Sequence, residues 1–94
     1  MMYKKKKSKP VWARYINSLH DADVVRFTCP HVSMIEAWVS GDPRSSYVTF
    51  ITEWDDYVVY FGNYVVWTDK KFKVVDEEKF QSKYEQIPES GSVY

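Results

Sequence analysis

Two short apolar runs in the first third of the chain predict two β-strands. Residues 11–16 are mostly apolar and follow Pro10, whose missing amide hydrogen is tolerated at the first position of a strand. In residues 23–29 apolar side chains recur at every second position, which is the period of a strand with one buried face. Pro30 ends this run. The pattern therefore predicts one strand over 11–16 and another over 23–29.

The next segment has the pattern of a short helix. Ser33 and Glu36 are spaced as a capping box, in which the two side chains satisfy free amides of the first helical turn. The apolar residues of the segment fall on one helical face. They are Met34, Ile35, Trp38 and Val39. Gly41 suits the position just after a helix end, so the sequence predicts a helix over residues 34–40.

The second half of the chain carries four β-branched and aromatic runs separated by short turns. The runs are 47–52, 57–61, 64–68 and 72–75. Because the connections are short, the four predicted strands are expected to form an antiparallel meander. Asp76 then suits the N-cap of a second helix. Phe80 and Tyr84 lie four residues apart and are placed to pack that helix against the sheet.

The two middle strands of this predicted meander are apolar at nearly every position, whereas a surface sheet alternates apolar and polar residues. Two interpretations stay open. Either the sheet is covered on both faces, by helices or by its own curling, or one face is an aromatic binding surface. The predicted fold class is α+β. We expect a small, strongly curled antiparallel sheet, a meander or half-barrel of about five or six strands, with one or two short helices.

Length and aromatic content favour a single domain. A chain of 94 residues suits one domain, and its four Trp, eight Tyr and five Phe can build a core despite the short length. Gly and Pro are sparse and scattered, so no internal linker is predicted. We predict a flexible basic N-terminal arm over residues 1–9, a single α+β domain over 10–87 and a flexible tail over 88–94.

The net charge of zero conceals an uneven distribution. Residues 1–14 carry six of the thirteen basic side chains and no acid, which leaves seven basic and thirteen acidic groups, a net charge of −6, in residues 15–94. The basic residues of the N-terminal segment are candidate contacts to nucleic-acid phosphates. They are Lys4, Lys5, Lys6, Lys7, Lys9 and Arg14. The same charges also suit a solvated terminus, and the acidic remainder of the chain would repel a duplex.

Candidate catalytic groups are few. Cys29 is the single cysteine, which excludes an intramolecular disulfide and suits the reducing cytoplasm. Cys29, His31 and His20 are the only nucleophile and base candidates, and an enzyme or small-molecule binder built on them is the least favoured alternative. No apolar run approaches the roughly 18 residues of a membrane span. We predict a cytoplasmic, non-catalytic protein with no metal, no cofactor and no membrane segment.

The case for binding rests on aromatic residues that lie beside acidic ones. Tyr and Trp are the side chains that most often anchor protein interfaces. Trp54 follows a glutamate in a predicted turn, where it either anchors an interface or folds under the turn and caps the sheet. The candidate partner-binding residues are Trp54, Asp55, Asp56, Tyr57 and Tyr60.

The two ends of the chain resemble a family of small phage and prophage proteins. Residues 3–13, YKKKKSKPVWA, resemble that family's start, KYRKKPVVVEA. Near the other end, FGNYVV at 61–66, FKVVDEEKF at 72–80 and KYE at 83–85 resemble the family's ending, PGDYIV … GEFYVVDPEEFEEKYE. This ending is sometimes called the PGDYG motif.

The resemblance covers residues 10–16 and 56–87 and does not extend to 20–46. Phe61 and Asn63 depart from the family, which has Pro and Asp at these places, although an Asn after glycine still suits a tight turn. The family implies a viral origin and action in the host cytoplasm. Its members have no agreed catalytic residues, so the resemblance implies no active site.

These observations favour a non-catalytic, phage-encoded binding protein that inhibits or sequesters a host factor. The expected target is a component of antiviral defence, as for an anti-CRISPR or similar inhibitor, because an acidic surface can mimic nucleic acid toward a basic groove. The partner is a host protein or a small signalling ligand, and a homodimer stays open. The alternative is a nucleic-acid-binding phage accessory protein that uses the basic arm and surface aromatics.

Overall fold

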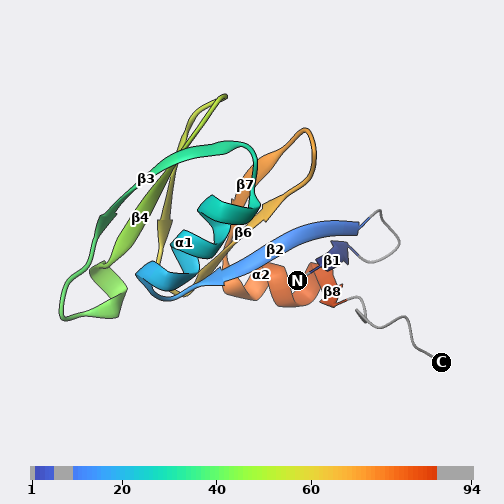
Figure 1. The fold of residues 1–94 in the computed structure, drawn as a ribbon. Coiled ribbons are helices and arrows are strands. Elements are labelled where there is room, and N and C mark those ends of the chain that lie inside the picture. The colour runs from blue at the N-terminus through green and yellow to red at the C-terminus, as the bar shows by residue number, and fades with distance from the viewer. Residues whose placement is uncertain (1, 6–9, 87–94) are drawn as a thin grey trace.

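The computed structural model describes residues 2–5 and 10–86, which form two antiparallel sheets and two helices (Figure 1). The five-stranded sheet has the order β7-β6-β2-β1-β8, and the three-stranded sheet has the order β3-β4-β5. The strands are β1 (Met2–Lys5), β2 (Pro10–Ile16), β3 (Val32–Trp38), β4 (Tyr47–Thr52), β5 (Asp56–Tyr60), β6 (Asn63–Trp67), β7 (Phe72–Val75) and β8 (Tyr84–Gln86). The helices are α1 (Leu19–Thr28) and α2 (Glu77–Lys83), and a 3-10 turn, η1 (Pro43–Ser45), precedes β4.

The five-stranded sheet is the middle layer of the fold, because it packs against other elements on both faces. On one face, Ile16 and Val65 belong to a core cluster shared with α1 and the three-stranded sheet. On the opposite face, Ala13 and Val66 belong to a second cluster, which includes Phe80 of α2. Of the two strands predicted to be apolar on both faces, β6 is therefore covered on both sides, by helices and a second sheet (Figure 1), whereas β5 belongs to the three-stranded sheet and exposes Val58 and Tyr60.

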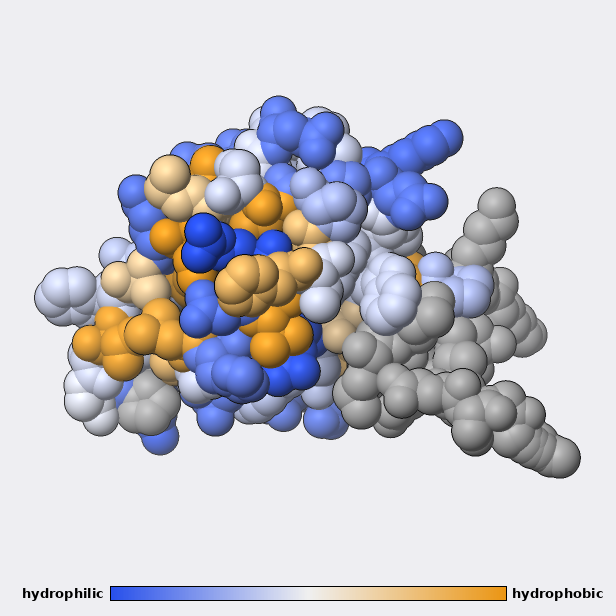
Figure 2. Space-filling view, in the orientation of Figure 1, coloured by the Kyte–Doolittle hydropathy of each residue, from blue (hydrophilic) through white to orange (hydrophobic). Residues whose placement is uncertain are grey.

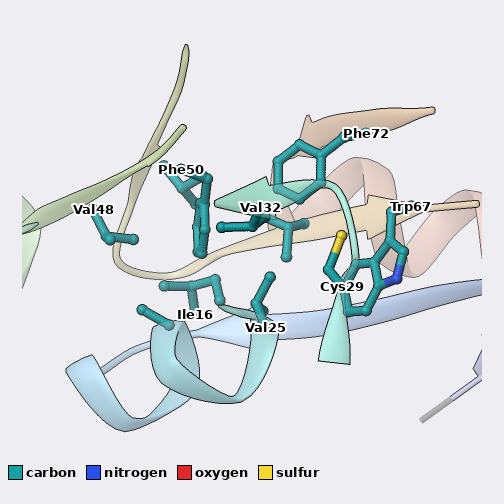
Figure 3. Packing of buried hydrophobic residues seen from close by; sticks show 11 residues of the cluster. Ile16, Val25, Cys29, Val32, Val48, Phe50, Trp67 and Phe72 are labelled. Carbon is teal, nitrogen blue, oxygen red and sulfur yellow. The ribbon is translucent and has the colours of Figure 1, made fainter. Parts of the chain in front are cut away.

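The larger core fills the space between α1 and the two sheets. Figure 3 shows Phe50 of β4 and Phe72 of β7 close together, and their ring centroids lie 5.6 Å apart. Ile16, Val25 and Val48 surround them from three different elements and have no exposed surface. Burying each side chain of this size contributes about 1.5–3 kcal/mol, so this cluster is the main source of stability.

A stack of aromatic rings holds α2 on the other face of the five-stranded sheet. The ring of Phe80 lies 3.7 Å from that of Tyr64 and 4.8 Å from that of Tyr84, in parallel arrangement. Asp76 caps the helix as predicted, with its carboxylate accepting a hydrogen bond from the amide of Lys79 at 2.8 Å. Phe80 and Tyr84 pack onto the sheet as expected, but Tyr84 is the first residue of β8 because the helix ends before it.

The strand predicted over residues 23–29 is wrong, because most of this segment belongs to helix α1. Ser18 is the N-cap, and its hydroxyl accepts a hydrogen bond from the amide of Asp21 at 3.2 Å. The buried residues of the helix and its C-cap are Ala22, Val25 and Cys29, which follow the spacing of a helix. Phe27, which completes the two-residue alternation in the sequence, is 80% exposed.

The helix predicted over residues 34–40 is also wrong, because Val32–Trp38 form β3. This strand pairs with β4 in antiparallel register, from Met34 opposite Ile51 to Trp38 opposite Tyr47. The hydroxyl of Ser33 caps no helix and instead donates to the carbonyl of Ile51 at 3.2 Å. Backbone pairing with a strand that follows later in the chain therefore outweighs the local capping signal.

All four strands predicted in the second half are present and antiparallel, but the single, strongly curled meander is wrong. β4 pairs with β5 in the three-stranded sheet, whereas β6 pairs with β7 and β2 in the five-stranded sheet. The chain crosses between the sheets at Phe61 and Gly62, whose amides donate to the carbonyls of Ser46 and Ile16 at 3.0 and 2.8 Å. Gly62 has a φ of 98°, a conformation that glycine adopts without a steric penalty.

The predicted domain boundaries also change at the N-terminus. Residues Met2–Lys5 of the predicted flexible arm form β1, which pairs with β2 on one side and with β8 on the other. The pairing places this part of the arm inside the five-stranded sheet, so the folded unit starts before residue 10. Lys6, Lys7, Lys9 and the predicted tail over 88–94 lie outside the described residues.

A hydrogen-bond network around Asp21 joins β2 to the start of α1. Arg14 donates to Oδ1 of Asp21 through Nε and Nη2 at 3.1 and 2.8 Å. The amide of Asn17 and the hydroxyl of Ser18 both donate to Oδ2 at 3.0 Å. Partial burial acts to raise the pKa of Asp21, but these hydrogen bonds and the charge of Arg14 outweigh it and hold the pKa below its ordinary value.

We expect the substitution Asp21→Asn to lower the free energy of unfolding by about 1–2 kcal/mol at pH 7, because it removes charged hydrogen bonds that are partly shielded from water. The native pKa is lowered, so this stability is fully present above the unfolded-state pKa of about 3.9. It is lost as the pH falls through the lower native pKa. Urea denaturation of both proteins should therefore give a difference that is constant from about pH 7 to pH 5 and shrinks below about pH 4.

The control for this measurement is Asp23→Asn, which removes the same charge from the same helix outside the network. Its effect should stay within about 0.5 kcal/mol. A stability difference for Asp21→Asn that does not shrink in acid would show that the carboxylate charge contributes nothing.

Candidate binding surface

The three-stranded sheet has one face in the larger core and one face that none of the described elements covers. Along β4, the side chains of Val48, Phe50 and Thr52 are buried. Those of the intervening residues, Tyr47, Thr49 and Ile51, point the other way and are only partly buried. The strand therefore has the alternation of a sheet with an uncovered side.

The register of the three strands assigns nine residues to this uncovered side, which we call the outer face. Its three cross-strand rows follow directly from the pairing of β3 and β5 with β4. The rows are Met34–Ile51–Asp56, Glu36–Thr49–Val58 and Trp38–Tyr47–Tyr60. Six of the nine side chains in these rows are apolar or aromatic.

The outer face exposes an unusual amount of apolar surface. Trp38 is 59% exposed, Met34 52%, Tyr60 50% and Val58 49%. The rings of Tyr47 and Tyr60 are in contact, with centroids 5.4 Å apart. The space-filling view, taken from the side of α1, shows further hydrophobic side chains among hydrophilic ones over this helix and over the end of β3 and β4 (Figure 2). Contiguous exposed apolar surface of this kind marks interaction sites in folded proteins.

The charged groups on the outer face are of one sign. Glu36 lies in the middle row and Asp56 in the row of Met34, and both are exposed. None of the nine residues of the outer face is basic. The surface therefore combines apolar contacts with negative charge, in a part of the chain whose net charge is already negative.

The structure brings only some of the predicted partner-binding residues together. Asp56 and Tyr60 are on the outer face. Tyr57 lies between them in sequence but points to the opposite side, where its ring is 5.1 Å from that of Phe72 in the core. The register explains this separation, because successive residues of a strand face opposite sides of the sheet.

Trp54 and Asp55 lie in the turn between β4 and β5, at one end of the sheet. The carbonyl of Asp55 accepts hydrogen bonds from the amide and the hydroxyl of Thr52 at 3.0 and 2.8 Å, which closes the turn. The ring of Trp54 packs at 4.5 Å from that of His31 and is 45% exposed. Trp54 therefore packs over the end of the sheet, and nearly half of its surface stays exposed to solvent.

The predicted set of partner-binding residues contains two of the nine residues of the outer face and omits seven. Three of the omitted residues are large, exposed hydrophobic side chains: Met34, Trp38 and Val58. Met34 and Trp38 were assigned to a helical face because the capping-box pattern suggested a helix. Their alternation with Glu36 was a signal for a strand, since Met34, Glu36 and Trp38 occupy every second position.

Of the six basic residues predicted to contact nucleic acid, the structure describes Lys4, Lys5 and Arg14. Arg14 is held by Asp21 in an ion pair of 2.8 Å, so a contact with phosphate requires this pair to open. Lys4 and Lys5 lie in β1, and the other lysines of the set are outside the described residues. Nothing in the described part of the chain therefore adds support to the nucleic-acid alternative at these positions.

His31, which directly precedes β3, has two polar contacts, and the one with Thr68 reaches the five-stranded sheet. The residue is 9% exposed, and its Nε2 lies 2.7 Å from the carbonyl oxygen of Thr68 in the turn between β6 and β7. Its Nδ1 lies 3.2 Å from Oε1 of Glu53 in the turn between β4 and β5. Both partners are acceptors, so each ring nitrogen forms its hydrogen bond only when it carries a proton.

The remaining candidate catalytic groups do not form a site. Burial raises the pKa of the Cys29 thiol, although the backbone amides of His31 and Val32 offset part of this effect. A buried thiol with a raised pKa is poorly suited to nucleophilic attack. His20 lies at the other end of α1, about 13 Å along the helix axis from Cys29. The structure therefore places His20 away from Cys29 and His31, and the ring of His31 contacts Glu53 and Thr68.

The described residues were compared with two structural patterns, a cluster of metal-ligating side chains and a membrane-spanning helix. No three His, Cys, Asp or Glu side chains gather there in a way that would hold a metal ion. None of the described helices is long and apolar enough to cross a membrane. Comparisons with protein-family models, with curated proteins and with solved structures give no match for this chain.

The contact of His31 with Thr68 leads to a direct test of how the sheets are joined. We expect His31→Phe, which keeps a ring beside Trp54 but removes both hydrogen bonds, to lower the free energy of unfolding by about 1–3 kcal/mol. Glu53→Gln is the control, because the Glu53 side chain is 60% exposed and its loss should cost less than about 1 kcal/mol. Urea denaturation followed by tryptophan fluorescence measures both. Equal stability of His31→Phe and the parent chain would mean that His31 does not join the sheets.

Proposed function

We propose that this chain is a non-catalytic binding protein and that its partner is a protein that docks on the outer face. The observation that carries the proposal is the row of Trp38, Tyr47 and Tyr60 beside the exposed Met34 and Val58. Aromatic side chains lose little conformational entropy on binding and bury large areas, which makes such rows effective anchors. Leaving this surface in water is unfavourable, and a partner that covers it recovers the cost.

The charge of the surface specifies the chemistry of the partner. Glu36 and Asp56 lie within the outer face, and residues 15–94 carry a net charge of −6. A second copy would bring the same acidic groups against one another, whereas a basic protein would find complementary charge. We therefore assign the outer face to a protein whose contact surface is apolar at its centre and basic around it.

The resemblance to the phage family supports a host factor as this partner. We propose that the chain inhibits or sequesters a component of antiviral defence in the cytoplasm of the host cell. A nuclease of such a system presents a basic groove for nucleic acid, and an acidic protein with an aromatic anchor suits that groove. Inhibition by occupying the groove requires no catalytic group on the inhibitor.

The proposal is tested by capturing proteins from extracts of the bacterial host with the tagged chain, followed by calorimetric titration of the purified partner. We expect Val58→Lys, which places a positive charge in the centre of the outer face, to weaken binding at least about tenfold. Phe27→Lys is the matched control. It adds the same charge at an exposed apolar residue of α1, on the core side of the three-stranded sheet, and should leave the affinity unchanged.

Two results would contradict the proposal. One is a specific partner that Val58→Lys binds as well as the parent chain does. The other is a dimer of the parent chain in sedimentation experiments that Val58→Lys dissociates, because the outer face would then be covered by a second copy.

A further inference from the structure

A second surface of the molecule is hollowed and carries the opposite charge. A depression of about 510 Å³ lies at the edge of the five-stranded sheet, beside the turn that connects β6 to β7. The start of β2, the end of β6, residues 68–71, Lys73 of β7 and Tyr84 of β8 line it. This volume lies within the range of about 300–1,000 Å³ that is typical of small-molecule sites.

The floor of the depression lies on the sheet face that carries α2, where Val11 is partly exposed and Val66 is buried beneath its neighbours. Val11 of β2 and Val66 of β6 lie on the same face as the residues under α2. The helix is anchored through the stack of Phe80 on Tyr64, which is one pleat away from Val66 on β6. Because α2 spans only seven residues, its cover ends before the β6–β7 turn.

Three lysines surround this floor. Lys70 and Lys71 come from the turn, and Lys73 stands opposite Val66 in the register of β6 and β7. All three are exposed, and Nζ of Lys73 lies 5.9 Å from the ring centroid of Tyr84. Among the described residues, none of the three ammonium groups forms an ion pair. Asp69 is the single acid among the lining residues, so the site has an excess of two positive charges.

This concentration of positive charge contrasts with the rest of the molecule. Residues 15–94 contain seven basic side chains against thirteen acidic ones, and three of the seven lie at 70–73. Lysines around a concave apolar floor are suited to a ligand with an anionic end and an uncharged body. Phosphate is the anion that lysine binds as a flexible point charge.

We propose that this depression binds a small phosphorylated molecule, with the phosphate held by Lys70, Lys71 and Lys73 and the uncharged part against Val11. A nucleic-acid strand carries the same phosphate chemistry, but the acidic groups elsewhere in residues 15–94 oppose a long polyanion. The site contains none of the nine residues of the outer face, so a test of ligand binding here is independent of the test of the proposed protein partner.

Amide chemical shifts in NMR titrations test the site, with adenosine monophosphate and inorganic phosphate as probes and adenosine as the probe without phosphate. Both phosphate-bearing probes should shift the amides of residues 66–73 in a saturable way, and adenosine should not. Lys71→Gln combined with Lys73→Gln should weaken binding of adenosine monophosphate by about tenfold or more. Lys79→Gln combined with Lys83→Gln removes the same charge from α2 and should change the affinity less than about twofold.

Three outcomes would overturn the proposal. The first is the absence of saturable shifts at these amides with either phosphate-bearing probe up to about 10 mM. The second is an equal loss of affinity in the two double variants, which would indicate general charge attraction only. The third is binding of a ten-nucleotide single strand at the same amides about tenfold or more tighter than adenosine monophosphate, which would assign the site to nucleic acid.

Discussion

The five-stranded sheet is apolar on both faces, and the requirement to bury both of them shapes the rest of the molecule. α1 and the inner side of the three-stranded sheet cover one face, where Ile16, Val65 and Trp67 join their core. α2 covers the other through Phe80 and its aromatic neighbours. Both helices and the three-stranded sheet therefore pack against the five-stranded sheet.

Two surfaces that are not needed to bury the middle sheet are the candidate binding sites of this fold. The inner side of the three-stranded sheet is buried in the larger core, and no described element covers its outer side. Trp38, Tyr47 and Tyr60 make this outer side strongly aromatic. On the middle sheet, the floor of the lysine-lined depression lies on the face that carries α2. The outer face thus has no covering layer among the described elements, whereas the depression lies beside a helix of only seven residues. They differ in charge, one negative and one positive, and so suit different ligands.

The sequence predicted best the elements whose signals are local. The strand runs at 47–52 and 72–75 and the N-cap at Asp76 are correct, because β-branched residues and a capping carboxylate act within a few positions. The α+β class and the antiparallel strands also follow from local pattern. The division of the strands into two sheets does not, since it depends on β6 pairing with the distant β2.

The errors in residues 20–46 arose where two periods fit the same residues. In α1, Val25 and Cys29 fit both the two-residue and the helical spacing, and only the exposure of Phe27 separates the two. In β3, pairing with β4 decides against the capping box at Ser33. Both outcomes depend on contacts between segments far apart in the sequence. Because residues 34–40 were predicted to be a helix, Met34 and Trp38 were not predicted to lie on the outer face. Two of the five predicted binding residues, Tyr57 and Tyr60, lie in the same strand, but the register of β5 places Tyr60 on the outer face and Tyr57 in the core.

Hydroxyl-radical footprinting of the free, monomeric chain tests most directly whether the outer face is uncovered. The comparison of like residues removes differences in intrinsic reactivity: Trp38 against the buried Trp67, and Tyr60 against the buried Tyr84. The structure predicts that Trp38 and Tyr60 are oxidised several-fold faster than their buried counterparts. Protection of Trp38 and Tyr60 to the level of Trp67 and Tyr84 would contradict the account, because the aromatic row would then be part of the core.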